Sequence, residues 1–277
     1  MPLGKQKSSL CPNVFGAEKL LIRNNLKRKL KSEKLCLGTW ITIGNPDIVE
    51  ILKNFEFDWF VFDMEHSYIS IETTKTMLQA LGDDPSGSGA TPIVRVGMND
   101  QLLTKRALDV GAQGILVPLV NTAEEARHVV KYAMYPPKGV RGAGPGRAAT
   151  YGMKTGEYLR VANDELVLAV QIETVEALSN AEEIVSTEGV DIGFVGPTDL
   201  TISLGLIDDR GNPKVAEAMR NVVKTCNKYD KVPGTMALNM DEARKWSELG
   251  FKFISLGSDA KHLISGARSF LEFAKKL

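Results

Sequence analysis

The sequence predicts a single (β/α)₈ TIM barrel, preceded by a basic N-terminal tail and a short helix. From Leu35 onward, short apolar runs rich in β-branched residues alternate with amphipathic stretches, which is typical of β-α units around a parallel sheet. Eight such repeats fill about 240 residues, and barrels of roughly 250 residues form one domain. A chain of this size buries about 75% of the surface that it exposes when unfolded, so its core needs no disulfides. An open, doubly wound sheet is the alternative architecture.

The expected strands and helices alternate along the chain. Strands are predicted at Leu35–Ile43, Asp58–Phe62, Pro92–Val96, Ile115–Leu119, Val167–Ile172, Asp191–Val195, Thr235–Leu238 and Phe253–Leu256. Helices are predicted at Asp47–Phe55, Ile71–Leu81, Asp100–Val110, Ala123–Tyr135, Val175–Ser186, Lys214–Tyr229, Asp241–Leu249 and Asp259–Lys275, with one more near Asn24–Lys31.

Local signals support several of these boundaries. The pairs Asn99–Asp100 and Asn121–Thr122 offer side-chain oxygens that can cap the following helices. Gly111 and Gly250 stand where a helix must end in a left-handed turn. The segment Pro136–Glu165 is rich in Gly and Arg and too long for a routine connection, so we expect it to be functional or to lie at an interface.

Charge is unevenly distributed. Residues 1–34 contain nine Lys and Arg and two acids, a net charge of +7, although 34 basic residues balance 34 acids overall. We expect residues 1–23 to form a flexible basic tail and residues 24–277 to form the barrel. A transit peptide is the alternative, but Arg and Ser are sparse there. The ending Lys275–Leu277 resembles the peroxisomal S-K-L address, with Lys in place of Ser. A cytoplasmic location is therefore expected, with a mitochondrial or peroxisomal location as the alternatives.

Composition also excludes several classes of function. The balanced charge gives no general attraction to nucleic acid or to an anionic membrane, and no run of 18 apolar residues exists. Cys11, Cys36 and Cys226 form no C-x-x-C pair, which argues against a zinc knuckle or a redox dithiol. Gly142–Arg147 matches neither nucleotide-binding glycine pattern. No Lys follows a predicted strand, so Schiff-base chemistry lacks its nucleophile.

Charged side chains stand instead at the carboxyl ends of four predicted strands, where TIM barrels carry their active sites. They are Asp63, Glu65 and His66 after the second strand, Arg95 at the end of the third, Glu173 after the fifth and Asp199 after the sixth.

Glu173 and Asp199 are the best metal candidates. Two carboxylates that face one point repel each other unless a cation or a proton neutralises them. Mg²⁺ and Mn²⁺ prefer oxygen ligands and accept one or two carboxylates, with substrate and water completing the coordination. The simpler alternative is that each acid caps the helix after its strand.

His66 and Arg95 are the candidates for proton transfer and charge stabilisation. A neutral imidazole can move protons near pH 7, and Asp63 or Asp109 could hold its tautomer. The alternative is a core histidine satisfied by the backbone. A fixed guanidinium can stabilise developing oxyanion charge, whereas the plainer interpretation of Arg95 is an ion pair with Asp63 or Glu65. The amides of Gly196, Thr198 and Asp199 would open a short helix, which favours an anion such as a carboxylate.

Seven stretches, taken together and in order, resemble the HpcH/HpaI family of metal-dependent (class II) pyruvate aldolases, from about Asn24 to the C-terminus. They are Gly38-Thr39-Trp40, Phe62-Asp63-Met64-Glu65-His66, Leu108-Asp109-Val110-Gly111-Ala112-Gln113, Val117-Pro118-Leu119-Val120, Tyr135-Pro136-Pro137-Lys138-Gly139-Val140-Arg141-Gly142, Gln171-Ile172-Glu173-Thr174 and Gly196-Pro197-Thr198-Asp199-Leu200. The basic leader, the Gly144–Gly146 segment and the loop Asp83–Ala90 depart from the family pattern.

The resemblance implies a role for each matching residue. Glu173 and Asp199 match the metal ligands. His66 matches the base or acid, with Asp109 as its dyad partner and Asp63 in support, and Arg95 matches the enolate-stabilising arginine. The remaining matches are pocket positions, namely Trp40, Gln171 and the amides of Gly196, Thr198 and Asp199 that grip the pyruvate carboxylate. A homo-oligomer is also implied, a hexamer built as a trimer of dimers that exchange the last helix.

The expected function is therefore that of a lyase. It would use a divalent cation to cleave a 2-keto-4-hydroxy acid reversibly to pyruvate and an aldehyde. Mg²⁺ or Mn²⁺ is the expected cation, with Co²⁺ or Zn²⁺ as the alternatives. Oxaloacetate decarboxylation or macrophomate-synthase-like enolate chemistry on the same site is the alternative. A barrel that binds a ligand without turnover is the third possibility, and the combination of His66, Arg95, Glu173 and Asp199 argues against it.

Overall fold

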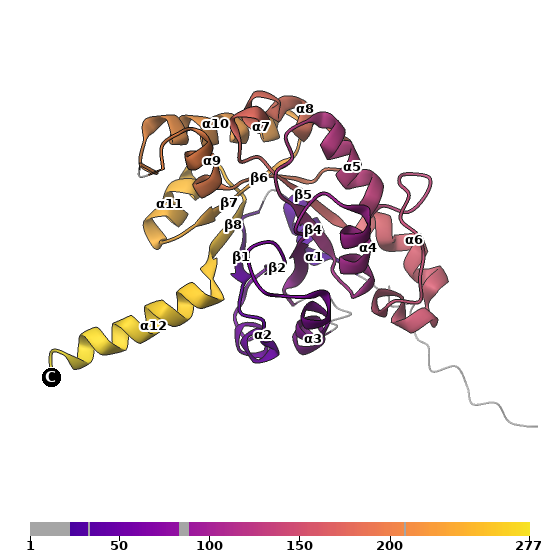
Figure 1. Cartoon of the computed structure of the whole chain (residues 1–277), viewed down its shortest axis with the longest axis horizontal. Coiled ribbons are helices and arrows are strands. Elements are labelled where there is room, and N and C mark those ends of the chain that lie inside the picture. The colour runs from indigo at the N-terminus through magenta and orange to yellow at the C-terminus, as the bar shows by residue number, and fades with distance from the viewer. Residues whose placement is uncertain (1–22, 33, 83–88, 208) are drawn as a thin grey trace, which may run out of the picture.

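The computed structural model describes residues 23–32, 34–82, 89–207 and 209–277. At its centre, eight parallel strands pair in sequence order and close into a barrel, with helices on the outside (Figure 1). The strands are β1 (Cys36–Ile41), β2 (Trp59–Asp63), β3 (Thr91–Arg95), β4 (Gly114–Val117), β5 (Val167–Gln171), β6 (Ile192–Val195), β7 (Val232–Ala237) and β8 (Phe253–Ser258). The predicted (β/α)₈ barrel is confirmed, and the open sheet is excluded.

The helices follow the predicted alternation, except that α6 is additional and one predicted helix is divided into α7 and α8. They are α1 (Asn25–Lys31), α2 (Pro46–Leu52), α3 (Ile71–Leu81), α4 (Gln101–Asp109), α5 (Ala123–Ala133), α6 (Thr155–Glu165), α7 (Val175–Ser179), α8 (Ala181–Val185), α9 (Pro197–Ser203), α10 (Pro213–Lys228), α11 (Met240–Leu249) and α12 (Asp259–Ala274). Residues 1–22, which make up nearly all of the predicted flexible tail, lie outside the described residues. Most of the predicted loop at 83–90 also lies outside them.

Several predicted boundaries were wrong for physical reasons. The single helix expected over Val175–Ser186 is divided at Asn180, whose side chain donates to the Asn121 carbonyl at 2.8 Å. Strand β7 begins at Val232, three residues before the predicted start. The prediction was late because Pro and Gly, here Pro233 and Gly234, are unfavourable inside most strands. A Cβ on Gly234 would lie 2.9 Å from the Phe194 side chain, so this glycine allows β6 and β7 to pack closely.

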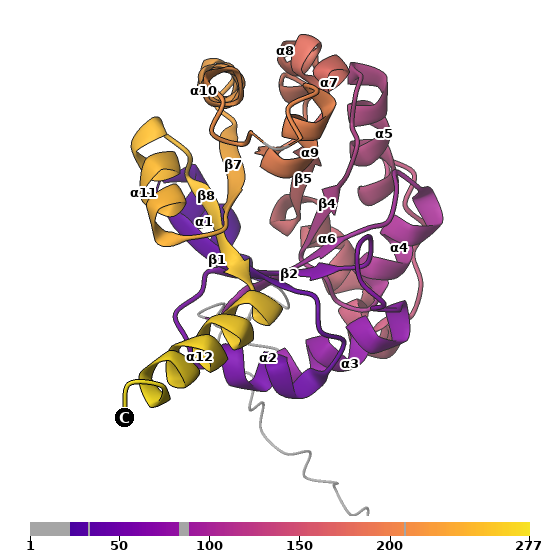
Figure 2. The ribbon, with the colours of Figure 1, turned by 60° about the vertical axis from the view of Figure 1, so that its left-hand side comes forward.

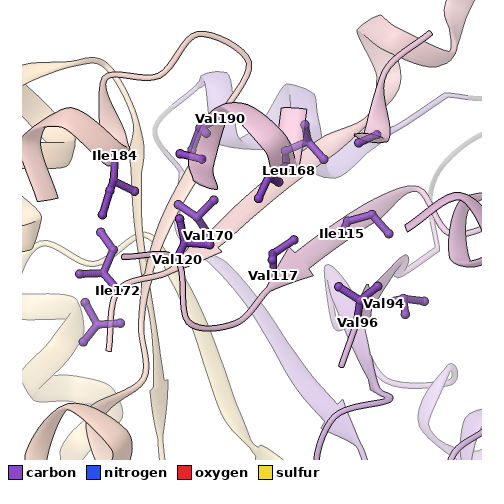
Figure 3. Close-up of a cluster of buried hydrophobic side chains, with 14 of the residues drawn as sticks. Val94, Val96, Ile115, Val117, Val120, Leu168, Val170, Ile172, Ile184 and Val190 are labelled. Atoms are coloured by element: carbon purple, nitrogen blue, oxygen red, sulfur yellow. The ribbon is translucent and has the colours of Figure 1, made fainter. Parts of the chain in front are cut away.

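Alternating side chains divide the core into two parts. On β3, Ile93 belongs to a cluster inside the barrel, whereas Val94 belongs to the cluster between strands and helices. Leu116 and Val117 on β4 alternate in the same way. Figure 3 shows part of the outer cluster, which includes Leu168 and Val170 of β5. This period of two is expected for a barrel whose interior is filled by side chains.

Helix α1 closes the amino-terminal end of the barrel. Its Leu26 and Leu30 belong to the interior cluster. The buried Asn24 caps α1 by accepting from Lys27 N, and its side chain donates to the Gln113 and Glu165 carbonyls beside β4 and β5. With that end closed, the carboxyl ends of the strands remain for a site.

Helix α12 stands apart from the other helices. It projects from the barrel in Figures 1 and 2, and residues 261–277 are exposed in this single chain. Its first residue, Asp259, is buried and accepts from Thr42 N, Thr42 Oγ1 and Ile43 N at 2.6–3.0 Å, which fixes the base of the helix to the loop after β1. Within the described ranges, none of the helices combines the length and apolar character needed to cross a bilayer.

Candidate active site at the carboxyl ends of the strands

Arg95 at the end of β3 is held by two acids and an aromatic ring. Its Nε and Nη2 donate to the two carboxylate oxygens of Asp63 at 2.9 and 2.7 Å, and Nη1 lies 3.1 Å from Glu65 Oε2. The guanidinium carbon lies 4.3 Å from the centroid of the Trp40 ring. Arg95 is 8% exposed. The expected ion pair therefore forms with both acids, and it leaves a cation fixed at the barrel rim.

Asp63 also shapes the turn that carries His66. Its Oδ1 accepts from the backbone N–H groups of Glu65 and His66 at 3.0 and 3.2 Å. Its backbone carbonyl accepts from Ser67 Oγ. Asp63 thus supports His66 through the backbone, and no hydrogen bond to the imidazole is found among the described residues.

His66 follows the carboxyl end of β2, and its imidazole is largely exposed. The side chain is 66% exposed, and its Nε2 lies 3.8 Å from Glu65 Oε1. A core histidine satisfied by the backbone is therefore excluded. The exposed ring is free to meet a ligand at the carboxyl ends of the strands.

The structure does not bring Asp109 to His66 within one chain. Asp109 ends α4, and a barrel helix runs antiparallel to its strands, so it lies at the amino-terminal end while His66 follows a strand at the other end. The Asp109 carboxylate accepts instead from Arg141 Nη2 at 2.8 Å. Arg141 is buried against the rings of Tyr135 and Tyr158.

Glu173 is a buried carboxylate just beyond β5. It is 3% exposed, accepts from the backbone N–H of Leu119 at 2.9 Å and accepts from Gln171 Nε2 at 2.6 Å. Thr174, not Glu173, caps α7 by accepting from Ala177 N. The alternative that Glu173 is a helix cap is therefore wrong.

The conformation of Leu119 serves this contact. The strand predicted to run to Leu119 ends at Val117, and Leu119 has a φ of 53°, a left-handed value that is unfavourable for a branched side chain. The turn directs its N–H at the Glu173 carboxylate. Backbone strain is thus placed beside the candidate metal ligand.

Negative charge outweighs positive charge around Glu173. Burial, followed by the carboxylates of Asp199 and Glu65, raises its pKa to about 7, against the lowering effects of the Leu119 N–H and of Arg95. Burial likewise raises the pKa of Glu65, against the lowering effects of Arg95 and His66. The acids of β2, β5 and α9 therefore share one electrostatic environment, as a cation site requires.

Asp199 lies in the first turn of α9 and is exposed. The predicted short helix after Gly196 is present, with no side-chain hydrogen bond at its N-cap. A Cβ on Gly196, the N-cap of α9, would lie 2.3 Å from Glu173 Oε2, so a side chain at this position would displace that carboxylate. The loop after β6 and the end of β5 form one wall.

These residues fit a divalent cation whose coordination is completed by substrate and water. The buried oxygen Gln171 Oε1 lacks a hydrogen-bond partner in the described part of the chain, beside a carboxylate that its amide nitrogen already contacts. No group of three or more His, Cys, Asp or Glu side chains in the described ranges is arranged around a metal position. Two carboxylates are nevertheless sufficient for Mg²⁺, which keeps several waters.

Glu65 is the residue of this site to which the sequence assigned no role beyond an ion pair. Glu65 lies in the turn after β2, where the alternation of side chains along a strand no longer predicts which way a residue faces. The contribution of Leu119 could not be read from sequence, because nothing in the residue type indicates its left-handed backbone.

Comparisons with known proteins agree with this geometry. A family model described as HpcH/HpaI aldolase/citrate lyase matches residues 37–266. The 4-hydroxy-2-oxo-heptane-1,7-dioate aldolase of Salmonella typhimurium is 37% identical over 249 residues, which are 90% of this chain and 93% of that protein.

Solved structures give the same result. An HpcH/HpaI aldolase/citrate lyase family protein from Burkholderia cenocepacia superposes with a TM-score of 0.86 at 32% identity, over 91% of this chain and 100% of that one. Macrophomate synthase has a TM-score of 0.77 at 26% identity, over 91% of this chain and 90% of its own. The barrel, the rim of acids around a fixed arginine and these matches together show that the chain belongs to the HpcH/HpaI aldolase/citrate lyase family.

Proposed function

We propose that the protein is a divalent-metal-dependent lyase that reversibly cleaves a 2-keto-4-hydroxy acid to pyruvate and an aldehyde. The observation that carries the proposal is the buried Glu173 carboxylate with its pKa raised to about 7, beside Asp199 and the fixed Arg95 rim. The aldolase named among its relatives performs a reaction of this class on a seven-carbon dioate.

Glu173 and Asp199 would hold the cation, with Mg²⁺ or Mn²⁺ suited best to an oxygen site and Co²⁺ or Zn²⁺ as alternatives. When bound, such an ion acts as a Lewis acid that polarises the keto group. The backbone amides of Gly196, Thr198 and Asp199 begin α9 and have no acceptor within the helix, so they can grip the substrate carboxylate.

Arg95 supplies the fixed positive charge. Asp63 accepts from two of its five N–H groups, and Glu65 lies within ion-pair distance of Nη1, so N–H groups remain to meet the keto oxygen as it becomes an enolate oxygen. Trp40 lies against the guanidinium plane and prevents it from swinging away. The arginine therefore stabilises charge without reorganising during the reaction.

His66 would handle the proton on the C4 hydroxyl. As a neutral imidazole it accepts that proton, the C4 oxygen forms the aldehyde, and the electrons of the C3–C4 bond pass into the enolate. Return of a proton to C3 gives pyruvate. In the synthetic direction the imidazolium donates the proton back to the new C4 hydroxyl.

The same enolate can arise from oxaloacetate by loss of CO₂, and the similarity to macrophomate synthase favours testing that reaction as a second candidate. The metal and arginine positions would be unchanged. Comparing oxaloacetate consumption with cleavage of a hydroxy keto acid under identical conditions separates the two.

We also propose that the chain assembles with copies of itself through α12, as a hexamer formed by a trimer of dimers. Leu263, Ile264, Phe270, Leu271 and Phe273 of this helix are each more than half exposed in the single chain. An isolated helix with so much exposed apolar surface gains stability by burying it against another subunit.

Pyruvate release from a 2-keto-4-hydroxy acid, measured with and without a chelator, tests the proposed function. Activity should vanish with the chelator, return with Mg²⁺ or Mn²⁺, and fall at least 10²-fold in Arg95→Ala. Because that variant leaves Asp63 and Glu65 unpaired, Arg95→Lys and the circular dichroism of both should be measured beside it. Turnover that persists in chelator would contradict the metal site, and no turnover with any metal would favour a barrel that only binds its ligand.

A further inference from the structure

We infer that Asn121 is a positioning residue, which holds the Glu173 carboxylate in place by joining the loop after β4 (residues 118–122) to the loop after β5 (residues 172–174). The inference rests on the proposed function, because it takes Glu173 to be a metal ligand. The contacts that support it are made by the chain alone, so they can be measured without metal and without turnover.

The side chain of Asn121 is not used as a helix cap, because its neighbour provides the cap. Thr122 caps α5 by accepting from Glu125 N at 3.2 Å. The Glu125 carboxylate in turn accepts from the backbone N–H of Asn121 at 2.6 Å. The backbone of Asn121 is thus anchored to the first turn of α5, while its side chain contacts other parts of the site.

This side chain bridges the two loops at the point where they meet Glu173. Its Nδ2 donates to the Leu119 carbonyl at 3.3 Å, and its Oδ1 accepts from Thr174 Oγ1 at 2.5 Å. Leu119 donates its own N–H to Glu173 Oε1 at 2.9 Å, and Thr174 follows Glu173 directly in the chain. One amide side chain therefore holds the donor loop and the acceptor loop together.

The backbone of Leu119 needs such support. Its φ of 53° lies in the left-handed region, where a residue other than glycine persists only if its surroundings hold it. The Leu119 side chain is 54% exposed, so its own packing supplies little of that restraint. A change to negative φ would alter the angle between the N–H and the carbonyl of Leu119, and the contacts to Glu173 and Asn121 could not both persist.

Two further contacts fix the bridge to the barrel. Val120 is buried in the same hydrophobic cluster as Ile172 (Figure 3), and its N–H donates to the Gln171 carbonyl at 3.3 Å. Asn180, between α7 and α8, donates from Nδ2 to the Asn121 carbonyl at 2.8 Å. The bridge therefore belongs to the folded scaffold and is in place before a ligand binds.

The two oxygens of Glu173 are held from different parts of the chain. Gln171 Nε2 donates to Oε2 from the end of the same strand, whereas Oε1 accepts from the loop that Asn121 fixes. Without the bridge, Leu119 is free to leave its left-handed conformation, Oε1 loses this donor, and the carboxylate can rotate. Removing a group that orients a metal ligand lowers metal affinity by about tenfold to a hundredfold.

Calorimetric titration of the metal-free, full-length chain with Mn²⁺ tests the inference. We expect Asn121→Ala to raise the dissociation constant about tenfold to a hundredfold. Asn54→Ala is the matched control, because the Asn54 amide also donates to two backbone carbonyls, those of Glu50 and Ile51, at the exposed end of α2. This control should leave the constant unchanged. Wild-type affinity in Asn121→Ala would overturn the inference.

A double-substitution cycle shows whether Asn121 acts through the bridge to Thr174. Thr174→Val removes the hydroxyl that donates to Asn121, but it also removes the cap of α7, so it is measured alone and together with Asn121→Ala. The bridge predicts that Thr174→Val weakens Mn²⁺ binding less in the Asn121→Ala background than in the wild type. Thr174→Ser keeps the hydroxyl and should retain most of the affinity. Losses that simply multiply would show that the two residues act independently and would refute the bridge.

Hydrogen–deuterium exchange of the metal-free protein, followed by mass spectrometry, gives a readout that needs no metal. In Asn121→Ala, peptides that contain Leu119 and Val120 should exchange several-fold faster, while β5 stays protected and shows that the barrel is folded. An unchanged rate in the loop would contradict the inference. Faster exchange in a protein whose wild type binds no Mn²⁺ would instead contradict the metal site of the proposed function, and the contact between Asn121 and the Glu173 loop would stand.

Discussion

At the scale of single residues, the buried Glu173 carboxylate destabilises the metal-free protein. Glu173 accepts from one amide N–H and one glutamine N–H, which is too little to offset its burial beside two other acids. An ordinary buried carboxylate would have a cationic partner in the fold. Arg95 lowers the pKa of Glu173 but does not restore it to its ordinary value, so a bound cation would relieve the remaining imbalance.

This shortage predicts a pH-dependent gain of stability in Glu173→Gln. Because the pKa is raised from 4.5 to about 7 in the folded protein, the native state binds the proton more tightly than the unfolded chain, and stability falls as the pH rises from about 4.5 to 7. Without metal, the variant should gain about 3 kcal/mol at pH 8 and less than about 1 kcal/mol at pH 5. The Gln171 amide can rotate so that its oxygen accepts from the N–H groups of the introduced amide side chain.

Urea unfolding in chelator at the two pH values measures this difference. Glu183→Gln, on the exposed surface of α8, should shift neither midpoint. Adding Mg²⁺ should stabilise the wild type and leave Glu173→Gln unaffected. Equal free energies of unfolding for wild type and variant at pH 8 would show that the ionised Glu173 carboxylate does not destabilise the folded protein.

At the scale of elements, the junction of β6 and α9 depends on a missing side chain. Gly196 passes so near Glu173 that a Cβ would lie 2.3 Å from Oε2 and 3.2 Å from the Glu173 Cβ. Its φ of −83° is open to any residue, so the demand for glycine comes from space and not from backbone conformation.

Gly196→Ala should therefore damage metal binding before it damages the fold. The added methyl forces the Glu173 carboxylate or the start of α9 to move, which separates the two candidate ligands. We expect the dissociation constant for Mn²⁺, measured by isothermal titration calorimetry, to rise at least tenfold, with a loss of stability of about 1–3 kcal/mol. Gly156→Ala in α6, where a Cβ meets nothing within 4 Å, is the control and should leave metal affinity unchanged. Wild-type affinity in Gly196→Ala would show that the two carboxylates do not share an ion.

The elements also show what a sequence can and cannot reveal. Strand positions were predictable because runs such as Val167–Val170 are continuously apolar and rich in β-branched residues. Helix α6 was hidden in a Gly- and Arg-rich stretch, and no side chain caps its start. Barrel topology brings the carboxyl ends of all strands to one end of the molecule. Once the strands were assigned correctly, it followed that this end carries Arg95, Glu173 and Asp199. The separation of Asp109 from His66 within one chain depends on the direction of α4, and a motif match carries no information about that.

At the scale of the whole molecule, one barrel end is closed and the other is open. Helix α1 fills the amino-terminal end with Leu26 and Leu30, while the carboxyl end gathers acids from strands far apart in sequence. The pairing of β1 with β8 closes the sheet and also anchors α12, because Asp259 follows β8 directly and accepts from the loop after β1. The projecting helix and the rim that carries the site are thus joined by one buried carboxylate.

The exposed apolar side chains of α12 predict that the protein self-associates through this helix. Leu263, Ala267, Phe270 and Ala274 repeat at helical spacing and form one apolar stripe, and both Leu263 and Phe270 are more than half exposed. Leu263→Glu with Phe270→Glu should reduce the mass measured by sedimentation velocity at micromolar concentration, since two charges would have to be buried between subunits. Glu272→Lys on the opposite face of the helix should leave the mass unchanged. If the wild type sediments as a monomer, or the doubly substituted chain retains the wild-type mass, the apolar stripe of α12 does not hold the subunits together.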